Sequence, residues 1–356
     1  MPEVTTQDVK DLLVGFRGQE ITLDKVRHEL QIEKGSKSFD GVRNILFQLA
    51  EQRVVKYVGR QTYKVIKPAK PVQVYGVKRE RRPVYPLIFP RDADKGMELD
   101  FAEHIIVREG DLLVIGGVKS TGKTTLILGF TGENIDKNPV LMGNEYTIID
   151  ENGEFEPAPR FVSRMDRMSE WVEWTNGDGQ DKFELLPVWD DYVENIIRNR
   201  LTMIDWINPD AGRAYDIGKI LGGLKSMSGR GVTIVALQKG ELGADGRGSN
   251  ARGGQYVRDF ADVELLLDGF GESEYDVLLT IKGVKEKTAP IVGKRYAYTI
   301  VNDGTQIVNF RQVKQCNECY GRKFSKGVPC ESCNRTGWVD RETSWDFILE
   351  VRHNEI

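Results

Sequence analysis

The chain lacks the long apolar run that a membrane span requires. Although 40% of its 356 residues are hydrophobic, no run of them approaches the roughly 18 residues needed to cross a bilayer. The first residues, Met-Pro-Glu-Val-Thr-Thr-Gln-Asp, also lack the basic and apolar regions of a secretory signal peptide. We therefore expect a soluble, cytoplasmic protein without a membrane partner.

Cysteine is scarce, and so is net charge of either sign. All four cysteines lie between Cys316 and Cys333, which argues against a disulfide framework spread over the chain. The formal net charge of −4 does not mark the whole chain as nucleic-acid-binding, so any basic surface must be local. The length leaves room for two or three domains, one of them large enough to bury a full α/β core.

The sequence does contain a phosphate-binding motif. The segment Gly117–Thr124, GVKSTGKT, fits G-x-x-x-x-G-K-[ST] at every position. It follows an apolar run that indicates a buried strand, Leu112–Ile115, and precedes the expected start of a helix, Thr125–Phe130, which is the context such a loop requires. Glycines let the backbone N–H groups turn toward phosphate oxygens, and the helix N-terminus adds partial positive charge.

The side chains of this motif have separate expected roles. Lys123 would reach the β- and γ-phosphates of ATP, and the hydroxyl of Thr124 would hold Mg²⁺. The residues that we expect to contact the nucleotide are Gly117, Val118, Lys119, Ser120, Thr121, Gly122, Lys123, Thr124 and Thr125.

Three further apolar runs end in a polar residue. Glu145 follows Pro139–Asn144, and a carboxylate at the carboxyl edge of a parallel sheet can orient or deprotonate an attacking water. Asp205 ends Leu201–Ile204 and would organise Mg²⁺. Gln238 ends a third run, beside the γ-phosphate, where its amide would report whether that phosphate is present.

Asp190 and Asp191 compete with Asp205 for the metal role. We prefer Asp205 because the apolar run before it is cleaner and because an amphipathic helix leads from it into the next strand. A glycine-rich loop then spans Lys239–Gly254. Loops this long are usually functional or disordered, and Arg247 and Arg252 would engage phosphates.

The first 66 residues predict three helices followed by a β-hairpin. This is the order of a winged helix-turn-helix domain, residues 1–66, whose third helix would present a polar face to a DNA groove. Lys37, Arg43 and Asn44 lie on that face, and Arg60 lies at the tip of the hairpin, where it would meet phosphates. The same residues also fit a domain that only holds proteins together.

The remaining domain boundaries are placed where the composition of the sequence changes. Residues 67–91 are rich in proline and carry the basic cluster Lys78–Arg82, which predicts an extended linker. Three roles remain open for the linker: it would act as a spacer, pack on a neighbouring subunit or contact a phosphate backbone. Residues 92–312 form the expected ATPase domain, and residues 313–338 form a cysteine module. Residues 339–356 form an amphipathic tail that would serve as a short docking element.

The cysteine module has the spacing of a zinc site. Cys316-x₂-Cys319 and Cys330-x₂-Cys333 are separated by ten residues, and two such knuckles complete a closed, tetrahedral Zn²⁺ site of structural type. The run also resembles the C-x-x-C-x-G knuckles of DnaJ-like proteins. The basic residues between the ligands would contact nucleic acid or a protein, or the module only stabilises its own small fold.

The order of the motifs resembles the RecA-like ATPase core, and most of all the DnaB-type replicative helicases. The segments that carry the resemblance are the phosphate loop, Glu145 in GNEYT, Asp205 in TMIDWI, Gln238 in VALQKG and Ala261–Val263 in RDFADVELLL. It covers roughly residues 97–312 and implies an α/β fold with a mostly parallel sheet.

The resemblance also implies roles. Glu145 would activate water, and Gln238 would couple loss of the γ-phosphate to the loop after it. The loops Asn208–Tyr215 and Lys239–Gly254 would line the channel of a homo-oligomeric, hexameric ring and grip single-stranded DNA. A cationic finger from one subunit would enter the site of its neighbour.

Two departures from the DnaB pattern stand out. DnaB-type proteins carry Lys-Asn-Arg at the end of the finger strand, whereas this chain has Lys282-Gly283-Val284-Lys285. Lysine fingers occur in RecA itself, so Lys282 and Lys285 are the expected catalytic cations here. The N-terminal domain also differs from the helical domain of bacterial DnaB.

These features together predict an ATP-dependent DNA helicase, active in DNA replication, that uses ATP, Mg²⁺ and Zn²⁺. Single-stranded DNA would pass through the motor loops, and duplex DNA would bind the N-terminal domain. Two alternatives remain open. One is a RecA-like recombinase or strand-annealing ATPase, and the other is an ATP-gated regulator or loader that selects a duplex site.

Overall fold

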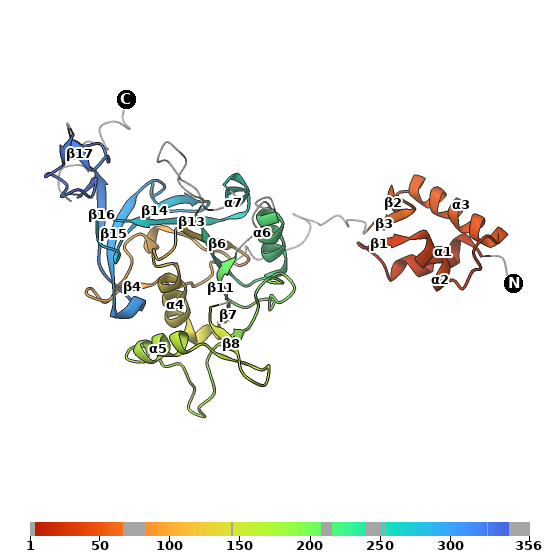
Figure 1. Ribbon diagram of the computed structural model, residues 1–356, viewed down its shortest axis with the longest axis horizontal. Coiled ribbons are helices and arrows are strands. Elements are labelled where there is room, and N and C mark those ends of the chain that lie inside the picture. The colour runs from red at the N-terminus through yellow and green to blue at the C-terminus, as the bar shows by residue number, and fades with distance from the viewer. Residues whose placement is uncertain are drawn as a thin grey trace. The chain divides into compact units, whose positions relative to one another are not determined.

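The chain consists of two compact units, which the computed structural model shows as Met1–Arg79 and Glu80–Ile356 (Figure 1). The structure describes residues 4–66, 83–143, 145–207, 216–239, 251, 254–325 and 327–341. Each unit is considered by itself below.

The N-terminal unit contains the three helices and the hairpin that the sequence predicts, and one additional strand. Its elements are α1 (Thr6–Val14), β1 (Glu20–Thr22), α2 (Leu23–Glu29), α3 (Lys37–Glu51), β2 (Val55–Gly59) and β3 (Thr62–Val65). The side chains of Thr5, Thr22 and Ser36 cap the three helices by accepting backbone N–H groups, as N-cap residues do. Strand β1, which sequence periodicity did not reveal, pairs antiparallel with β3.

The hairpin turn lies where the sequence places it. Arg60 and Gln61 both have positive φ angles, 47° and 59°, as the two central residues of a type I′ turn require. Tyr57 and Tyr63 face each other across the hairpin, and their rings are 5.4 Å apart. The winged-helix interpretation of this unit stays a prediction.

The second unit is built on one large sheet, and its α/β fold class is the one predicted. Six neighbouring strands are parallel. In spatial order they are β10 (Glu184–Leu186), β7 (Val140–Met142), β11 (Thr202–Ile207), β12 (Thr233–Gln238), β6 (Leu112–Gly117) and β13 (Val263–Gly269). The polar residues singled out in the sequence therefore share the carboxyl edge of a parallel sheet.

The sheet continues as an antiparallel extension beyond β13. This part contains β14 (Asp276–Val284), β15 (Arg295–Val301), β16 (Gln306–Gln315), the short strands β4 (Arg91–Asp92) and β5 (Met97–Glu98), and β19 (Trp338–Asp340). The sequence predicted only β14 among these. Strands β15 and β16 mix polar and apolar residues, and the sequence analysis found no motif in them.

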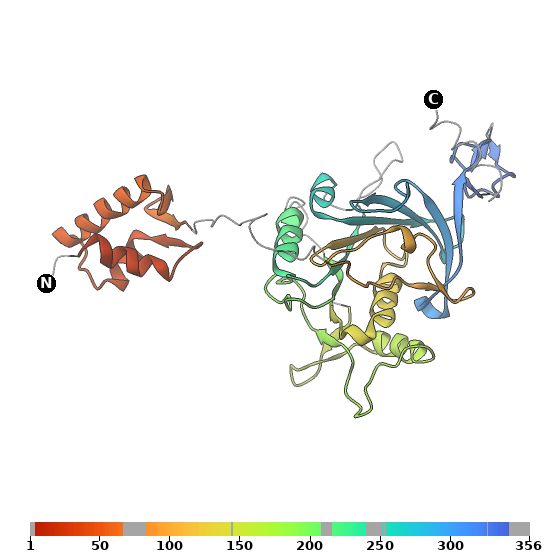
Figure 2. The same ribbon diagram turned by 180° about the vertical axis from the view of Figure 1, so that it is seen from behind.

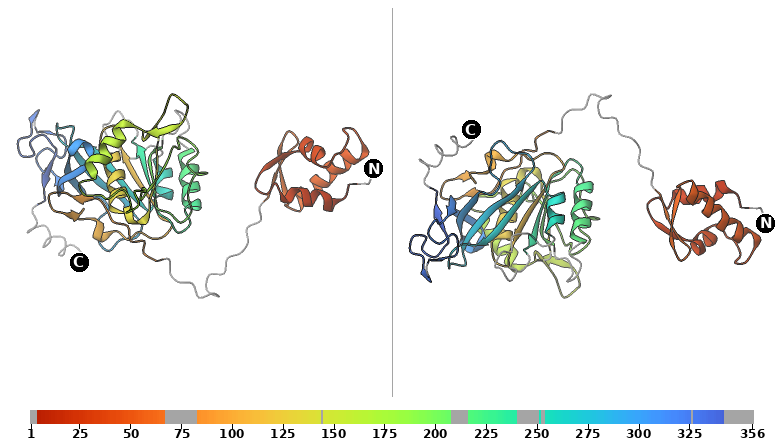
Figure 3. Two further views of the ribbon diagram at one scale, coloured as in Figure 1. Left: turned by 90° about the horizontal axis from the view of Figure 1, so that it is seen from below. Right: turned by 90° about the horizontal axis from the view of Figure 1, so that it is seen from above.

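Helices cover both faces of the parallel strands (Figure 1, Figure 2 and Figure 3). On one face α4 (Lys123–Glu133) and α5 (Pro159–Met168) pack with Leu113 and Ile115, and on the other α6 (Asp216–Met227) and α7 (Gln255–Phe260) pack with Leu112 and Val114. Successive strand residues point to opposite faces, so burial on both sides explains the continuous apolar runs.

Smaller elements complete this unit. They are the hairpins β8 (Thr147–Ile149) with β9 (Phe155–Pro157) and β17 (Phe324–Ser325) with β18 (Val328–Pro329), and the 3₁₀ turns η1 (Ala102–His104), η2 (Ile135–Lys137) and η3 (Asn302–Gly304). Across the described residues, every helix is too short or too polar to cross a bilayer.

The second unit begins earlier than the predicted linker boundary at residue 91. Val84 forms a bridge with Arg108, the N–H of Tyr85 donates to the carbonyl of Val107 at 2.8 Å, and Phe89 is buried in the core. The prolines in this segment do not prevent packing, because aromatic residues lie between them. Residues 67–82 lie outside the described part of the chain.

Candidate nucleotide site and metal centre

The phosphate loop joins β6 to α4 through a tight turn. Ser120 and Gly122 have φ angles of 63° and 80°. A Cβ on Gly117 would lie 2.5 Å from Oγ1 of Thr121, and one on Gly122 would lie 2.3 Å from Cδ1 of Ile300. Both positions therefore require glycine, and the loop has the strand–loop–helix geometry that the motif predicts.

Lys123, the first residue of α4, folds back along the loop. Its Nζ donates to the carbonyls of Gly117 at 3.1 Å and Val118 at 2.7 Å. Burial lowers the pKa of Lys123, while Asp205 and Glu145 raise it. A desolvated ammonium beside the loop N–H groups suits a phosphate anion.

Asp205 is the buried carboxylate of the site. It lies in β11 with 1% of its surface exposed, and the hydroxyl of Tyr146 donates to its Oδ2 at 2.6 Å. Burial raises the pKa of Asp205, whereas the side chains of Tyr146 and Thr124 lower it. Its Oδ1 is buried and makes no hydrogen bond to any described residue.

The oxygens at this position fit Mg²⁺. A buried carboxylate oxygen without a hydrogen-bond partner costs free energy until a cation or donor meets it. Mg²⁺ prefers hard oxygen ligands, and both Asp205 and the hydroxyl of Thr124 supply them. The competing residues Asp190 and Asp191 are exposed and follow β10, at the far edge of the sheet.

Glu145 follows β7 and is exposed at the same edge of the sheet. Its Oε1 accepts a hydrogen bond from Nε1 of Trp206 at 3.2 Å. A Cβ on Gly143 would lie 2.0 Å from the carbonyl oxygen of Asp205, so the ends of β7 and β11 approach closely only because residue 143 is glycine. This approach brings Glu145 near Lys123 and Asp205, whose pKa values it raises.

Tyr146, Trp206 and Gly143 belong to this candidate site and were not selected in the sequence analysis. Gly143 could have been found, because a glycine directly after a short apolar strand suggests close backbone approach. Tyr146 and Trp206 gave no such indication, since their partners lie 59 and 61 positions away.

Gln238 lies beside the phosphate loop. It is opposite Gly117 in the parallel pairing of β12 with β6, and the N–H of Lys239 donates to the carbonyl of Gly117 at 2.9 Å. The ammonium of Lys239 is buried and forms an ion pair with Asp268 on β13. Lys239, next to Gln238, thus contacts β6 through its backbone and β13, the strand beyond β6, through its side chain.

Lys282 and Lys285 do not join this site within one chain. Strand β14 runs antiparallel to β13, so its carboxyl end lies at the edge opposite to the phosphate loop. Nζ of Lys285 lies 3.1 Å from Oδ1 of Asp262, whose Oδ2 accepts the N–H of Leu112 at the start of β6. Burial, and then the charge of Arg258, lower the pKa of Lys282.

Arg164, on α5, is a cation near the loop that the sequence analysis did not select. A Cβ on Gly304 would lie 3.7 Å from Nη2 of Arg164 and 3.8 Å from Oγ1 of Thr125. The half-buried Arg164 makes no hydrogen bond or ion pair with the described residues. Its neighbour Arg167, one turn later, forms an ion pair with Asp303.

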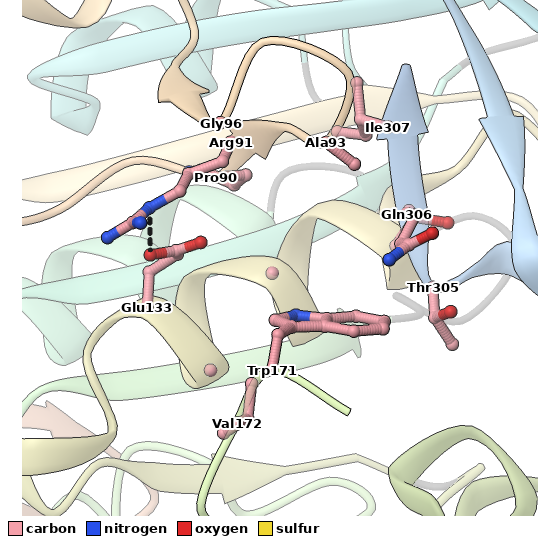
Figure 4. Close-up of a pocket in the computed structure, with 13 residues that line it drawn as sticks. Pro90, Arg91, Ala93, Gly96, Glu133, Trp171, Val172, Thr305, Gln306 and Ile307 are labelled. Atoms are coloured by element: carbon pink, nitrogen blue, oxygen red, sulfur yellow. Dashed lines mark ion pairs between the residues drawn. The ribbon is translucent and has the colours of Figure 1, made fainter. Parts of the chain in front are cut away.

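A cavity of about 330 Å³ begins at Thr125 and runs along α4. Figure 4 shows Trp171 extending toward Thr305 and Gln306, and the indole is 40% exposed. Further along α4, Arg91 pairs with Glu133 at 2.8 Å. The cavity therefore offers an aromatic face and an amide directly beside the phosphate loop.

The four cysteines form one buried cluster. Their sulfur atoms all lie within 4.8 Å of one another, with Cys316 to Cys330 at 3.8 Å and Cys319 to Cys333 at 3.5 Å. A tetrahedral Zn²⁺ with Zn–S bonds of about 2.3 Å requires sulfur atoms about 3.8 Å apart. The predicted ligand set therefore fits Zn²⁺.

The cysteine module is attached to the sheet. Strand β19 pairs with β16, the guanidinium of Arg295 lies 4.5 Å from the ring centroid of Trp338, and Arg335 forms an ion pair with Glu272 at 3.2 Å. The module is therefore anchored to the antiparallel extension, at the C-terminal end of β16.

The DNA-binding candidates of the N-terminal unit lie on its surface. Lys37 begins α3, and Arg60 lies in the hairpin turn; both are exposed. Arg43 and Asn44 line a groove of about 660 Å³ between α3 and the hairpin, together with Leu23, Asp40, Phe47, Ala50, Tyr57, Gln61 and Tyr63. This surface combines one cation and two amides with aromatic rings and one carboxylate.

Other candidates lie outside the described residues. These are Arg247 and Arg252, the channel loop 208–215, all but three residues of the loop 239–254, Lys326 and the tail beyond residue 341.

No protein-family model and no curated protein sequence matches the chain. Among solved structures, a RadB recombinase has a TM-score of 0.41 and 16% identity, covering 56% of this chain and 90% of its own. A DnaB-like replicative helicase, solved in a study of its interactions with primase, has a TM-score of 0.38 and 14% identity. It covers 56% of this chain and 59% of its own. Similarities of this size assign no activity.

Proposed function

We propose that the second unit is a Mg²⁺-dependent ATPase that drives movement along single-stranded DNA, as a ring-forming helicase. One observation carries the ATPase proposal. The phosphate loop, a buried carboxylate with one oxygen that has no partner among the described residues, and an exposed carboxylate meet at one edge of a parallel sheet. A phosphate cradle, a metal ligand and a water-activating base are the parts that nucleotide hydrolysis needs.

Each residue has a defined role in this proposal. The loop N–H groups and Lys123 bind the β- and γ-phosphates, and Thr124 and Asp205 hold Mg²⁺, which would neutralise phosphate charge when bound. Tyr146 keeps the Asp205 carboxylate in place. Glu145, oriented by Trp206, accepts a proton from the attacking water.

The cavity beside Thr125 is the proposed site of the nucleobase. The exposed indole of Trp171 offers a stacking face, and the amide of Gln306 can both donate and accept hydrogen bonds at a base edge. We expect Trp171→Ala to weaken binding of a fluorescent ATP analogue about ten-fold, while inorganic triphosphate competes equally with both proteins. Equal nucleotide affinity in the variant would place the base elsewhere.

Lys282 and Lys285 can act on phosphate only in another copy of the chain. Their edge of the sheet is opposite to the phosphate loop, so a contact between the two edges relates neighbouring copies head to tail. Such contacts close into rings when the rotation allows it. Hexameric assembly, binding of duplex DNA by the N-terminal unit, and Zn²⁺ in the cysteine cluster belong to the same proposal.

A strand-displacement assay tests the helicase activity. The wild-type protein, with ATP and Mg²⁺, should release a labelled strand from a forked duplex with one polarity, and the Glu145→Gln variant should not. Strand exchange by nucleoprotein filaments, without displacement, would instead indicate a recombinase. Sequence-selective duplex binding that requires the N-terminal unit, again without displacement, would indicate a regulator.

A further inference from the structure

The cysteine module exposes an aromatic and basic segment, Tyr320–Phe324. The side chains of Tyr320 and Phe324 are 68% and 53% exposed. Arg322 and Lys323, between them, are also exposed, and their side chains make no hydrogen bond or ion pair with any described residue. Large exposed aromatic side chains beside free cations indicate a binding surface.

The side chains of this segment are not needed to hold the module in place. The four cysteines are buried, and the contacts to the sheet come from β19, Trp338, Arg335 and the backbone carbonyl of Tyr320, which accepts from Nε2 of Gln315 on β16 at 2.7 Å. The segment Tyr320–Phe324 takes part through its backbone only: the N–H of Arg322 donates to the carbonyl of Cys319, and the carbonyl of Lys323 accepts from Cys330. Within the described part of the chain, the two cationic side chains are therefore available to another molecule.

We propose that Tyr320–Phe324 binds single-stranded nucleic acid. Bases stack on the rings of Tyr320 and Phe324, and phosphates contact Arg322 and Lys323. Stacking on aromatic side chains combined with backbone charge contacts is the way proteins bind single strands without sequence preference. Four residue steps span at most about 14 Å, so a strand of a few nucleotides contacts the whole segment.

The local charge of the segment is positive. Four thiolates and one Zn²⁺ would carry a net charge of about −2, so phosphate is expected to keep away from the cysteine side. Arg322 and Lys323 are adjacent, and no acidic residue lies between Tyr320 and Phe324. A purely apolar polypeptide would gain nothing from these two cations. The proposal is independent of hydrolysis and adds a second strand contact outside the ATPase site.

Fluorescence anisotropy with labelled oligothymidylate tests the proposal on the full-length, zinc-loaded chain without nucleotide. Stacking contributes about 1–3 kcal/mol per base, so the double variant Tyr320→Ala/Phe324→Ala should bind at least about ten-fold more weakly. Phe155→Ala, which removes another exposed ring, is the matched control and should bind like the wild type. Zinc content, measured with a chromogenic chelator, should be the same in all three proteins.

A second variant keeps the test decisive if the aromatic variant loses zinc. Arg322→Gln/Lys323→Gln removes two phosphate contacts and should lower the slope of log K against log salt concentration by about 1.4. Wild-type affinity in the aromatic variant, or an unchanged salt slope in the charge variant, would overturn the proposal. So would tighter binding of an unfolded polypeptide than of the oligonucleotide.

The two proposals fail in distinguishable ways. Loss of the segment should leave ATP hydrolysis in the absence of DNA unchanged. Failure of the ATPase proposal would appear as hydrolysis that survives Lys123→Ala, whatever the module binds.

Discussion

Replacing Asp205 by asparagine should make the free protein more stable and abolish its ATPase activity. Asp205 is 1% exposed, accepts one hydrogen bond from Tyr146, and has a buried oxygen without a partner among the described residues. Burying a carboxylate in this way costs several kcal/mol, which attraction to Lys123 and the Tyr146 bond only partly offset. Asparagine keeps the shape, and its oxygen still accepts from Tyr146.

The expected gain is about 1 kcal/mol. Removing the charge relieves the desolvation cost, while the Tyr146 bond falls from the strength of a charged pair, about 1.5–3 kcal/mol, to that of a neutral one, about 0.5–1.5 kcal/mol. The net increase in the free energy of unfolding then lies within the roughly 0.5–2 kcal/mol of a typical stabilising substitution. For a unit of this size, that raises Tm by about 2–4 °C.

The pH dependence of the gain has a definite sign. Because burial raises the pKa of Asp205 in the folded state, its contribution to stability is present below the unfolded pKa and is lost as pH rises through the folded pKa. The advantage of Asp205→Asn should therefore be full at neutral pH and shrink as the pH falls toward about 4.

Thermal unfolding without Mg²⁺ and nucleotide measures this gain. Asp190→Asn, at an exposed carboxylate, is the matched control and should leave Tm unchanged. Adding Mg²⁺ and ATP at about 100 times Kd should stabilise the wild type by about 2.7 kcal/mol and the Asp205→Asn variant by much less. A variant less stable than the wild type at neutral pH would refute our account of Asp205.

Three further predictions concern other parts of the second unit. Glu145→Gln should reduce kcat by about 10²–10⁴-fold while the affinity for ATP, measured by equilibrium binding, stays within about two-fold. Arg164→Ala should weaken ATP binding about ten-fold, which is the effect of losing one charge-assisted contact. The control Arg167→Ala breaks the ion pair with Asp303 and should lower Tm more than it lowers the affinity for ATP. If both variants change the affinity equally, Arg164 does not contact ATP directly. Cys330→Ser should release Zn²⁺ to a chromogenic chelator and unfold the cysteine module, because metal binding supplies most of the folding free energy of such a module. A Cys330→Ser variant that retains its metal would contradict the tetrahedral Zn²⁺ site.

The parallel half of the sheet was predictable because burial on both faces leaves continuous apolar runs. The runs before Glu145, Asp205 and Gln238 each became a strand of this sheet. Glu145 lies beyond the end of β7 and Gln238 ends β12, whereas β11 continues past Asp205 to Ile207. The glycines of the phosphate loop were predictable for a different reason, since the motif needs glycine where φ is positive, at Gly122, and where a Cβ would meet Thr121, at Gly117.

The antiparallel extension and the contacts across the site were not predictable. Strands β15 and β16 carry polar or partly exposed residues between their buried apolar ones, so the apolar residues form no clear run. Tyr146 meets Asp205 through pairing of β7 with β11, a long-range contact that no local pattern encodes. Lys282 and Lys285 were predicted as a finger that enters the site of a neighbouring subunit; the antiparallel direction of β14 places them opposite to the phosphate loop of their own chain, and their role in another copy stays a prediction.

Steady-state ATP hydrolysis, measured with and without single-stranded DNA, tests the central claim most directly. The account predicts a rate that single strands raise many-fold and that Lys123→Ala and Glu145→Gln both abolish. A rate indifferent to single strands but raised by duplex DNA would contradict the motor, and hydrolysis that persists in Lys123→Ala would contradict the nucleotide site itself.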